Sequence, residues 1–469
     1  MADLTAVLWT RATGAPRRLA TLVVNEAGAL SVTYDGGAIK DRLPGLSAMH
    51  DLAIRRDVVY PATYANLLPP ALAELAPPHH PAGRLNPQRV IVEALAERVY
   101  AARAWKPANR HQREWDLLLI GGRGGIGVLD VFSSDERAER WYATPSSASD
   151  LLLDRDGVGA AFRSIVASSA MVPIEMVGGG RAAAMPSVGG VMPKALARFD
   201  PGTGRVFLDL GGGAKAERPG VPAVVKIEAT GYGGIVELET LAYQAAAAAG
   251  LRTPRVWTLD PPEFRPMLVV ERVDMGVDGA AMPIETLFSV LFEASGGRVA
   301  SADQAPYEMV AAALLNPNVP VAGERAKATA TLFRQVLLSL LIGNGDLHLR
   351  NMAVLGTRRD GLELSPVYDP APMRAWDEHD IVAACNLGGL DLDRATAPPQ
   401  LDAALGHFAR SCALSKTAIA DAFEQCLAAG ARFLEAVKES RVEERRKASL
   451  LRRAGQVRAI VEKAAPPHG

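Results

Sequence analysis

The chain has few cysteines and carries almost no net charge. Its three cysteines, Cys385, Cys412 and Cys426, form no C-x-x-C pair and are odd in number, which argues against a disulfide framework and a structural zinc site. A reducing cytoplasm is the compartment that fits them best. The 51 basic and 52 acidic side chains give a formal charge of −1, which argues against a protein that coats nucleic acid by bulk charge. A local basic patch remains compatible with this balance.

Long apolar runs are missing as well. No window offers about 18 uninterrupted apolar residues, so we expect no membrane span. The stretch at 331–342 (TLFRQVLLSLLI) is too short, contains Arg334 and Gln335, and is interpreted as a buried helix. The N-terminal MADL lacks a basic region followed by an apolar run, so we expect no signal peptide. The chain does have an ordinary globular composition, 49% apolar and 22% charged over 469 residues, which is enough for more than one hydrophobic core.

The first part of the chain predicts a small α+β unit. Residues 20–24 and 29–33 predict two strands around a turn at Gly28, and residues 90–104 have apolar side chains at helical spacing. Residues 115–120 (WDLLLI) and 127–132 predict further strands.

The rest of the chain predicts strands first and helices later. Residues 134–180 predict two helices, and residues 186–273 predict mostly strands, interrupted by a helix at 237–249 that Gly250 ends. The remainder is mostly helical and closes with one long charged helix at 434–464, whose basic patches alternate with glutamates and favour a solvated amphipathic face. A strand-rich part followed by a helical part is the coarse plan of a protein kinase.

One glycine motif suggests a different function. Residues 122–127 match G-x-G-x-x-G and follow a predicted strand, as in dinucleotide-binding folds. That function needs a helix to begin at the motif, so that its N-terminal amides meet the pyrophosphate. The next residues, Val128 to Phe132, instead predict a strand. We therefore interpret the motif as a turn between two strands.

The most informative segment is residues 341–351, LIGNGDLHLRN, which follows an apolar helix. Asp346 and Asn351 are five residues apart, and Asp369 comes 18 residues later, after a predicted strand. Kinases use this arrangement: one Asp accepts the proton of the substrate hydroxyl, and an Asn and a second Asp hold Mg²⁺ at the phosphates of ATP. A D-x-x-x-x-N pair alone is common by chance.

Each of these residues also has a purely structural interpretation. Asp346 could be a turn residue beside Gly343 and Gly345, Asn351 a cap, and Asp369 the end of a strand. The kinase interpretation therefore depends on further elements earlier in the chain.

A strand lysine is the first of these elements. Lys226 lies between β-branched residues in VVKIE, and a buried ammonium group needs an anionic partner. The following helix offers Glu237 and Glu239, of which we choose Glu239. The alternative is a surface strand whose lysine faces solvent.

Two more segments complete the nucleotide site. Residues 186–194 predict a phosphate-binding loop, although a plain hairpin loop is an equally open interpretation. Its candidate ligands for phosphate are Ser187, Val188, Gly189, Gly190 and Lys194. The apolar strand at 267–273 predicts a hinge that binds adenine, with Glu271 and Val273 as candidate residues.

Taken together, these motifs resemble the HipA-type toxin kinases of bacterial toxin–antitoxin systems. The resemblance covers most of the chain, and its most specific part is GNGDLHLRN followed by SPVYD, close to the family pattern G-N-x-D-x-H-x-K-N followed by x-P-x-Y-D. Arg350 stands where the family commonly has lysine.

The resemblance implies a fold and a set of roles. The expected fold is α+β: an N-terminal subdomain at 1–145, a strand-rich kinase N-lobe at 146–275 and a helical C-lobe at 276–469. The implied roles are a catalytic base for Asp346, shaping of its loop for His348, Mg²⁺ binding for Asn351 and Asp369, binding of ATP phosphates for Lys226 held by Glu239, and autophosphorylation for Ser187.

The resemblance also implies an activity and partners. The activity is Ser/Thr protein phosphorylation by a cytoplasmic toxin, with an aminoacyl-tRNA synthetase as substrate, glutamyl-tRNA synthetase being the first guess. The implied partner is a HipB-like helix-turn-helix antitoxin, through which the chain would reach DNA indirectly. Two alternatives stay open: a kinase-fold regulator with another protein or a small molecule as substrate, and a non-catalytic nucleotide-binding partner of a DNA-binding protein.

Overall fold

The computed structural model describes residues 4–61, 68–76, 87–168, 192–209, 220–276, 280–303, 305–319 and 324–466. The chain forms two compact units. Unit 1 contains residues 1–229 and 259–284, and unit 2 contains residues 230–258 and 285–469. The expected division into three parts, with boundaries after residues 145 and 275, stays a prediction.

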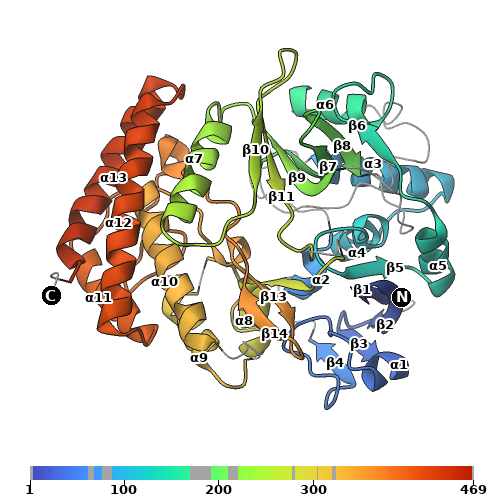
Figure 1. The fold of residues 1–469 in the computed structure, drawn as a ribbon. Coiled ribbons are helices and arrows are strands. Elements are labelled where there is room, and N and C mark those ends of the chain that lie inside the picture. The colour runs from blue at the N-terminus through green and yellow to red at the C-terminus, as the bar shows by residue number, and fades with distance from the viewer. Residues whose placement is uncertain are drawn as a thin grey trace. The chain divides into compact units, whose positions relative to one another are not determined.

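Unit 1 begins with a five-stranded antiparallel sheet (Figure 1). Its strands are β1 (Leu4–Thr13), β2 (Ala15–Val24), β3 (Leu30–Tyr34), β4 (Asp57–Tyr60) and β5 (Leu129–Phe132), in the order β4-β3-β2-β1-β5. The predicted hairpin is confirmed, because β2 pairs with β3 across the turn that contains Gly28, whose φ is +81°. The first strand, β1, was not expected.

The helices of unit 1 partly agree with the sequence pattern. Short helices α1 (Gly36–Lys40) and α2 (Pro70–Ala73) lead to α3 (Pro87–Ala102), which confirms the helix expected at 90–104. Two more helices, α5 (Asp135–Ala143) and α6 (Val158–Ser168), confirm the pair expected after residue 134.

The strand expected at 115–120 is wrong, because these residues belong to helix α4 (Arg110–Gly121). Asn109 caps this helix, and its side-chain oxygen accepts a hydrogen bond from the Gln112 N–H at 2.9 Å. The buried Trp115 and Leu118 are three residues apart and so lie on one helical face. A short apolar run fits a buried helix as well as a strand, and here the cap at its start favours the helix.

The second sheet of unit 1 carries the strand lysine. Antiparallel pairing joins β6 (Ala148–Asp150), β8 (Arg205–Asp209), β7 (Lys194–Asp200), β9 (Val221–Ile227) and β11 (Met267–Glu271), in that spatial order. The outermost strand beyond β11 is β10 (Val256–Leu259), where the chain passes from unit 2 back to unit 1. The mostly stranded character expected for this region is confirmed for the residues that the structure describes.

Unit 2 contains helix α7 and all the α-helices that follow it in the described part of the chain (Figure 1). In chain order, its elements are α7 (Ile235–Ala248), α8 (Leu287–Ala294), α9 (Tyr307–Leu315), α10 (Arg325–Ile342), α11 (Leu401–Ser411), α12 (Lys416–Glu439) and α13 (Glu444–Ala464), with a small sheet of β12 (Ile284–Thr286), β13 (Ala353–Thr357) and β14 (Gly361–Leu364). Gly250, with a φ of +74°, follows α7 as expected. Helix α10 confirms the buried helix expected at 331–342.

The single long helix expected at 434–464 is wrong, because the chain turns at 440–443 and divides it between α12 and α13. The buried Val442 holds this turn in place, and no glycine or proline marks it in the sequence. Helix α13 is amphipathic, with Leu450, Ala454 and Val457 buried, but its basic side chains are not all solvated. Arg453, for example, is only 7% exposed.

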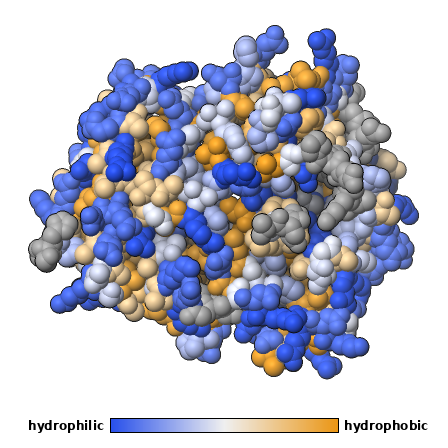
Figure 2. Space-filling view, in the orientation of Figure 1, coloured by the Kyte–Doolittle hydropathy of each residue, from blue (hydrophilic) through white to orange (hydrophobic). Residues whose placement is uncertain are grey.

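The polarity of the surface and the hydropathy of the helices agree with the ordinary globular composition of the chain. On the face shown in Figure 2, hydrophilic residues are spread over most of the surface rather than gathered in one region. In the described part of the chain, no helix has both the length and the apolarity to cross a membrane. The three cysteines are buried as free thiols, and burial raises the pKa of each to about 12.

Candidate active site

Two lysines face each other in the second sheet of unit 1. Lys194 is the first residue of β7 and lies directly opposite Lys226 of β9 in the antiparallel register. Residues directly opposite in such a pair point to the same face of the sheet. Lys194 and Lys226 are only 4% and 5% exposed, and each takes part in polar or ionic interactions. This pair places two ammonium groups on one face, which suits a ligand with several negative charges such as a polyphosphate.

These positions refine the expectations for the nucleotide loop. Lys194 was expected in that loop, but it begins a strand. The surface-facing alternative for Lys226 is wrong, because this side chain is buried. Ser187, Val188, Gly189 and Gly190 lie outside the described residues.

The expected hinge begins as a strand and ends in a network of polar contacts. Strand β11 stops at Glu271, so Val273 lies just beyond it. Arg272, which lies between these two residues, forms a buried ion pair with Asp274, and the joined atoms are 2.6 Å apart. Burial raises the pKa of Asp274, but the charge and hydrogen bonds of Arg272 outweigh this and leave the pKa of the carboxyl group below its usual value.

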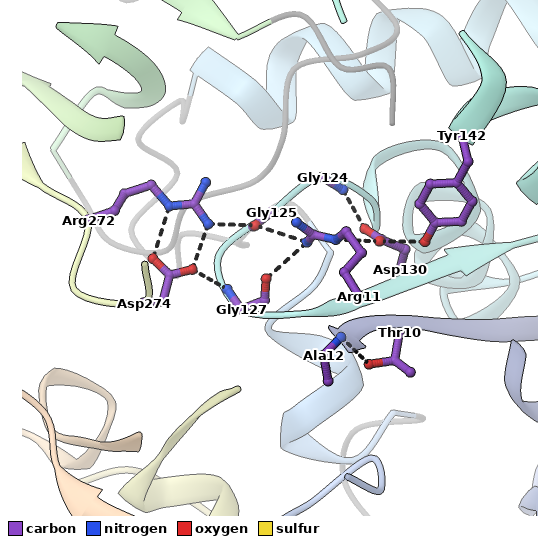
Figure 3. Close-up of polar contacts among 10 residues, drawn as sticks. All are labelled: Thr10, Arg11, Ala12, Gly124, Gly125, Gly127, Asp130, Tyr142, Arg272 and Asp274. Atoms are coloured by element: carbon purple, nitrogen blue, oxygen red, sulfur yellow. Dashed lines mark hydrogen bonds and ion pairs between the residues drawn. The ribbon is translucent and has the colours of Figure 1, made fainter. Parts of the chain in front are cut away.

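The network ties the end of the hinge to the glycine-rich turn at 122–127, as Figure 3 shows. The Gly127 N–H donates to Asp274 at 2.6 Å, and Arg272 donates to the Gly125 carbonyl at 3.2 Å. Arg11 reaches the same turn from β1, with a hydrogen bond of 3.0 Å to the Gly127 carbonyl. The segment after β11 is therefore held in a fixed position by the N-terminal sheet.

The structure of the same turn argues against a dinucleotide-binding motif at 122–127. It follows α4, not the strand that was expected, and it leads into β5 rather than into a helix. Asp130 of β5 accepts hydrogen bonds from the Gly124 N–H, from Arg11 and from the Tyr142 hydroxyl. No helix begins at this motif, so the amides needed for a pyrophosphate are missing there.

In unit 2, Asp346 and Asn351 belong to one tight loop after α10. The Asn351 Nδ2 donates to the Asp346 carbonyl at 2.8 Å, and the Asp346 N–H donates to the Asn344 side chain at 3.0 Å. The loop begins at Gly343, which has a φ of +71° and ends α10. Asn344 and Asn351 are buried, whereas 48% of the Asp346 side chain is exposed. The loop therefore presents the Asp346 carboxylate from a rigid backbone.

His348 lies beside that carboxylate. Its Nε2 is 3.9 Å from the Asp346 Oδ1. Its other ring nitrogen, Nδ1, is buried and has no hydrogen-bond partner among the described residues. The structure thus places one nitrogen of His348 near the Asp346 carboxylate, and the role of His348 in shaping the loop stays a prediction.

Residues from α9, α10 and the segment around Cys385 contact the backbone of this loop. The Tyr307 hydroxyl of α9 donates to the Leu347 carbonyl at 2.8 Å, and burial raises the pKa of this tyrosine well above its usual value. Ser339 of α10 donates to the Asn344 carbonyl at 2.7 Å. Cys385 packs against the same loop, with its Sγ 4.0 Å from the Leu347 carbonyl oxygen. A protonated tyrosine and thiol therefore lie under the loop, and neither adds a charge to it.

Asp369 has an unusual backbone. It was expected to end a strand, but β14 stops at Leu364, and Asp369 lies in the irregular segment that follows. Its φ is +55°, in the left-handed region that few residues other than glycine, asparagine and aspartate adopt. Its N–H donates to the Tyr243 hydroxyl of α7 at 3.2 Å. Strained residues of this kind gather at active sites, where the surrounding structure holds them.

Glu239 shares a face of α7 with Tyr243. The two residues are four apart in the helix, and both are only 2% exposed. Because Tyr243 contacts Asp369, the face that carries Glu239 is tied to the segment of Asp369 within unit 2. The pairing of Glu239 with Lys226 stays a prediction.

The expected metal ligands have suitable chemistry. In the described part of the chain, no group of three or more His, Cys, Asp or Glu side chains could hold a metal ion. A kinase-type Mg²⁺ site needs fewer protein ligands, because phosphate oxygens and water complete it. The Asp369 carboxylate and the Asn351 amide oxygen are hard oxygen donors of the required kind, and the Asn351 nitrogen is already bound to the loop.

Arg350 is the departure from the family pattern. Its guanidinium group lies 4.5 Å above the centre of the Phe288 ring, and its carbonyl accepts a hydrogen bond from the Tyr368 hydroxyl. The side chain therefore stacks on α8, and its backbone joins the Asn351 loop to the segment of Asp369.

Sequence reasoning missed several residues that hold the site. Tyr243 could have been found from its spacing of four after Glu239, and Asn344 from its place in the catalytic stretch. The pairing of Lys194 with Lys226 depends on strand register, and the support from Tyr307 depends on tertiary packing. The sequence carries no local signal for either.

Known proteins resemble this chain in its domain pattern and its fold. The model of the HipA-like C-terminal domain matches residues 186–433, more than half of the chain. A comparison with curated proteins gives no match. Among solved structures, HipA of Shewanella oneidensis MR-1, determined in complex with HipB and operator DNA, is 16% identical, with a TM-score of 0.56 over 95% of each chain. The proinflammatory kinase CtkA of Helicobacter pylori is 12% identical over 53% of this chain and 88% of its own, with a TM-score of 0.35.

These findings agree with the motifs at 341–351 and 365–369. The domain match includes Lys194, Lys226, Glu239, Asp346 and Asp369. The likeness to the Shewanella protein extends the common fold to nearly the whole chain. The chain belongs to the HipA family.

Proposed function

We propose that this chain is a protein kinase that transfers the γ-phosphoryl group of ATP to a serine or threonine hydroxyl. The observation that carries the proposal is the loop in which Asn344 and Asn351 fix the backbone of Asp346 and leave its carboxylate exposed. Phosphoryl transfer depends mainly on positioning and electrostatic stabilisation, and this loop supplies both for one acid.

Each residue has a role in the transfer. Asp346 accepts the proton of the substrate hydroxyl while the hydroxyl oxygen of the substrate attacks the γ-phosphorus. The bond between the γ-phosphorus and the β-phosphate oxygen breaks, and ADP leaves. Lys194 and Lys226 balance the negative charge of the phosphates, and the backbone at Glu271 and Val273 binds adenine. Mg²⁺, held by Asn351 and Asp369, would neutralise charge on the β- and γ-phosphates.

The two-lobed arrangement is part of the proposal. Residues 146–275 would form the N-lobe and residues 276–469 the C-lobe, with residues 1–145 as an additional subdomain. Glu239 would pair with Lys226 and hold it for ATP. Ser187 would be the site of autophosphorylation that switches the kinase off, because a new dianion would disturb a loop that binds phosphates.

Membership of the HipA family supports a proposal for the biological role. We propose a toxin that inhibits translation by phosphorylating an aminoacyl-tRNA synthetase, with glutamyl-tRNA synthetase as the first candidate. The Shewanella relative is bound to HipB and operator DNA. A HipB-like antitoxin is accordingly the proposed partner, through which this chain would reach DNA.

The test is phosphotransfer by purified protein in a bacterial lysate with ATP and Mg²⁺, followed by mass spectrometry. We expect one dominant new phosphosite on a protein, and loss of at least about 10³-fold in rate for Asp346→Asn. The matched control is Asp360→Asn, because Asp360 is an exposed acid in the β13–β14 turn. Full activity of Asp346→Asn would refute the assignment, whereas ATP binding without any turnover would favour a non-catalytic partner.

A further inference from the structure

The loop that leads into α7 is bound by the C-terminal hairpin, which consists of α12, the turn at 440–443 and α13. Arg446 of α13 donates to the Gly231 carbonyl at 3.0 Å and also donates to the Gly233 carbonyl. Glycine occupies positions 231, 233 and 234, so this loop has little stiffness of its own. Its conformation therefore depends on the groups that bind it.

Arg446 makes these bonds from a partly buried position. Its guanidinium group lies 5.3 Å from the centre of the Trp376 ring, and only 20% of the arginine side chain is exposed. The Trp376 indole nitrogen donates to the same Gly231 carbonyl at 3.0 Å, and the ring packs against Tyr232 at 5.5 Å between centroids. Hydrogen bonds of a charged donor are stronger when water is excluded.

A second set of contacts fixes the first turn of α7. The Arg441 N–H, at the start of the hairpin turn, lies 3.1 and 3.2 Å from the two carboxylate oxygens of Glu237. Gly234 caps α7 with a φ of +89°, and a Cβ atom there would come within 3.0 Å of Val442. The hairpin turn thus touches the helix start at van der Waals distance.

Glu239 lies between these contacts and a second anchor. The hairpin holds the helix before Glu239, and Tyr243 holds it one turn after, through its bond to Asp369. A helix displaced at its first turn would carry Glu239 with it, because α7 moves as a rigid element. Contacts on either side of Glu239 thus define the position of this part of α7 within unit 2.

We propose that Arg446 is a positioning residue, which holds the loop before α7 and so keeps Glu239 in the orientation that phosphoryl transfer requires. The catalytic consequence rests on the proposed kinase function. The anchoring of α7 itself does not, so it can be tested by a measurement that needs no activity.

The activity test is a double-mutant cycle. We expect Arg446→Ala to lower kcat/KM for ATP about tenfold, Arg446→Lys to retain part of the rate, and Arg446→Ala to cause no further loss in the Glu239→Gln background. A residue that only stabilises the fold would lower the rate by the same factor in both backgrounds. The matched control is Arg458→Ala, because Arg458 lies on the same helix in an exposed pair with Glu462 and should leave the rate unchanged.

The second measurement is hydrogen exchange of the amides at 235–243. We expect faster exchange in Arg446→Ala and in Glu237→Ala, which breaks the other contact, and no change in Arg458→Ala. Equal exchange in all variants, or losses that multiply in the cycle, would overturn the inference. If the wild-type chain transfers no phosphate, the kinase proposal fails, and hydrogen exchange alone decides whether the hairpin anchors α7.

Discussion

At the scale of single residues, the site depends on side chains in costly surroundings. Lys194 and Lys226 place two buried positive charges on one face of a sheet, and Asp369 adopts a left-handed backbone. Burying like charges together is unfavourable unless anions balance them. Each lysine takes part in polar or ionic interactions of its own, so these three positions are informative for their burial and their backbone and not for an unbalanced charge.

Lys194 should therefore matter for ATP more than for turnover. We expect Lys194→Gln to raise the KM for ATP about tenfold and to change kcat much less, because the ammonium group binds phosphate in the ground state as well as in the transition state. Titration of ATP in a phosphotransfer assay measures both constants. Arg198→Gln, on the same strand, is the control, and an unchanged KM in Lys194→Gln would remove this lysine from the nucleotide site.

We expect asparagine at position 369 to leave the free energy of unfolding nearly unchanged and a β-branched residue to lower it. Its φ of +55° suits asparagine, whereas valine in this region costs about 1–2 kcal/mol. We expect Asp369→Val to unfold at lower denaturant than Asp369→Asn, although both lose the carboxylate. Equal midpoints in urea would show that the backbone here is unstrained.

At the scale of elements, strands and helices with clear periodicity could be predicted, and those set by capping or packing could not. The hairpin around Gly28 and helix α10 follow from local pattern. Residues 115–120 have too few residues to show a period, and the cap at Asn109 lies outside the run. The break at 440–443 has no local signal, because it depends on Val442 packing near Gly234.

In the candidate site, too, residues close in sequence could be predicted and tertiary contacts could not. The spacing of Asp346, Asn351 and Asp369 could be read directly, because one loop and its neighbour in sequence carry them. The helical face that Tyr243 shares with Glu239 could be read in the same way, but its bond to Asp369 could not, since that bond depends on how α7 packs against a segment more than a hundred residues later.

The cap of α4 can be tested directly. We expect Asn109→Ala to lower the free energy of unfolding by about 1 kcal/mol, because the Gln112 N–H loses its acceptor. Asn109→Asp keeps an acceptor and should leave stability nearly unchanged. Urea denaturation of the two variants distinguishes the cases, and an unaltered midpoint for the alanine variant would mean that the cap contributes nothing.

At the scale of the whole molecule, neither unit is a continuous stretch of chain. The chain leaves unit 1 after residue 229, returns at 259 and leaves again after 284. A fragment that ends at the first crossing would lack strand β11 of unit 1 as well as the helices of unit 2. The expected linear succession of subdomains does not reveal this interleaving.

Acid stability gives a prediction at this scale. The pKa of Asp274 is lowered in the folded chain, so its ion pair with Arg272 stabilises the fold above the unfolded pKa of about 3.9 and loses this effect as the pH falls below it. We expect the melting temperature to fall less steeply between pH 5 and pH 3 (about one unit on either side of that pKa) in the double variant Arg272→Met, Asp274→Leu. Parallel curves of melting temperature against pH for the wild type and the double variant would contradict this stabilising role of the ion pair.

The contact between α7 and the C-terminal hairpin also has a consequence during synthesis. Arg446 follows Gly231 by 215 residues. At about 5–20 residues per second, a ribosome needs on the order of 10–40 s to make the chain between them. Throughout that interval α7 has left the ribosome's active centre without its anchor. If the anchor is needed for activity, a nascent chain of this protein stays inactive until α13 emerges.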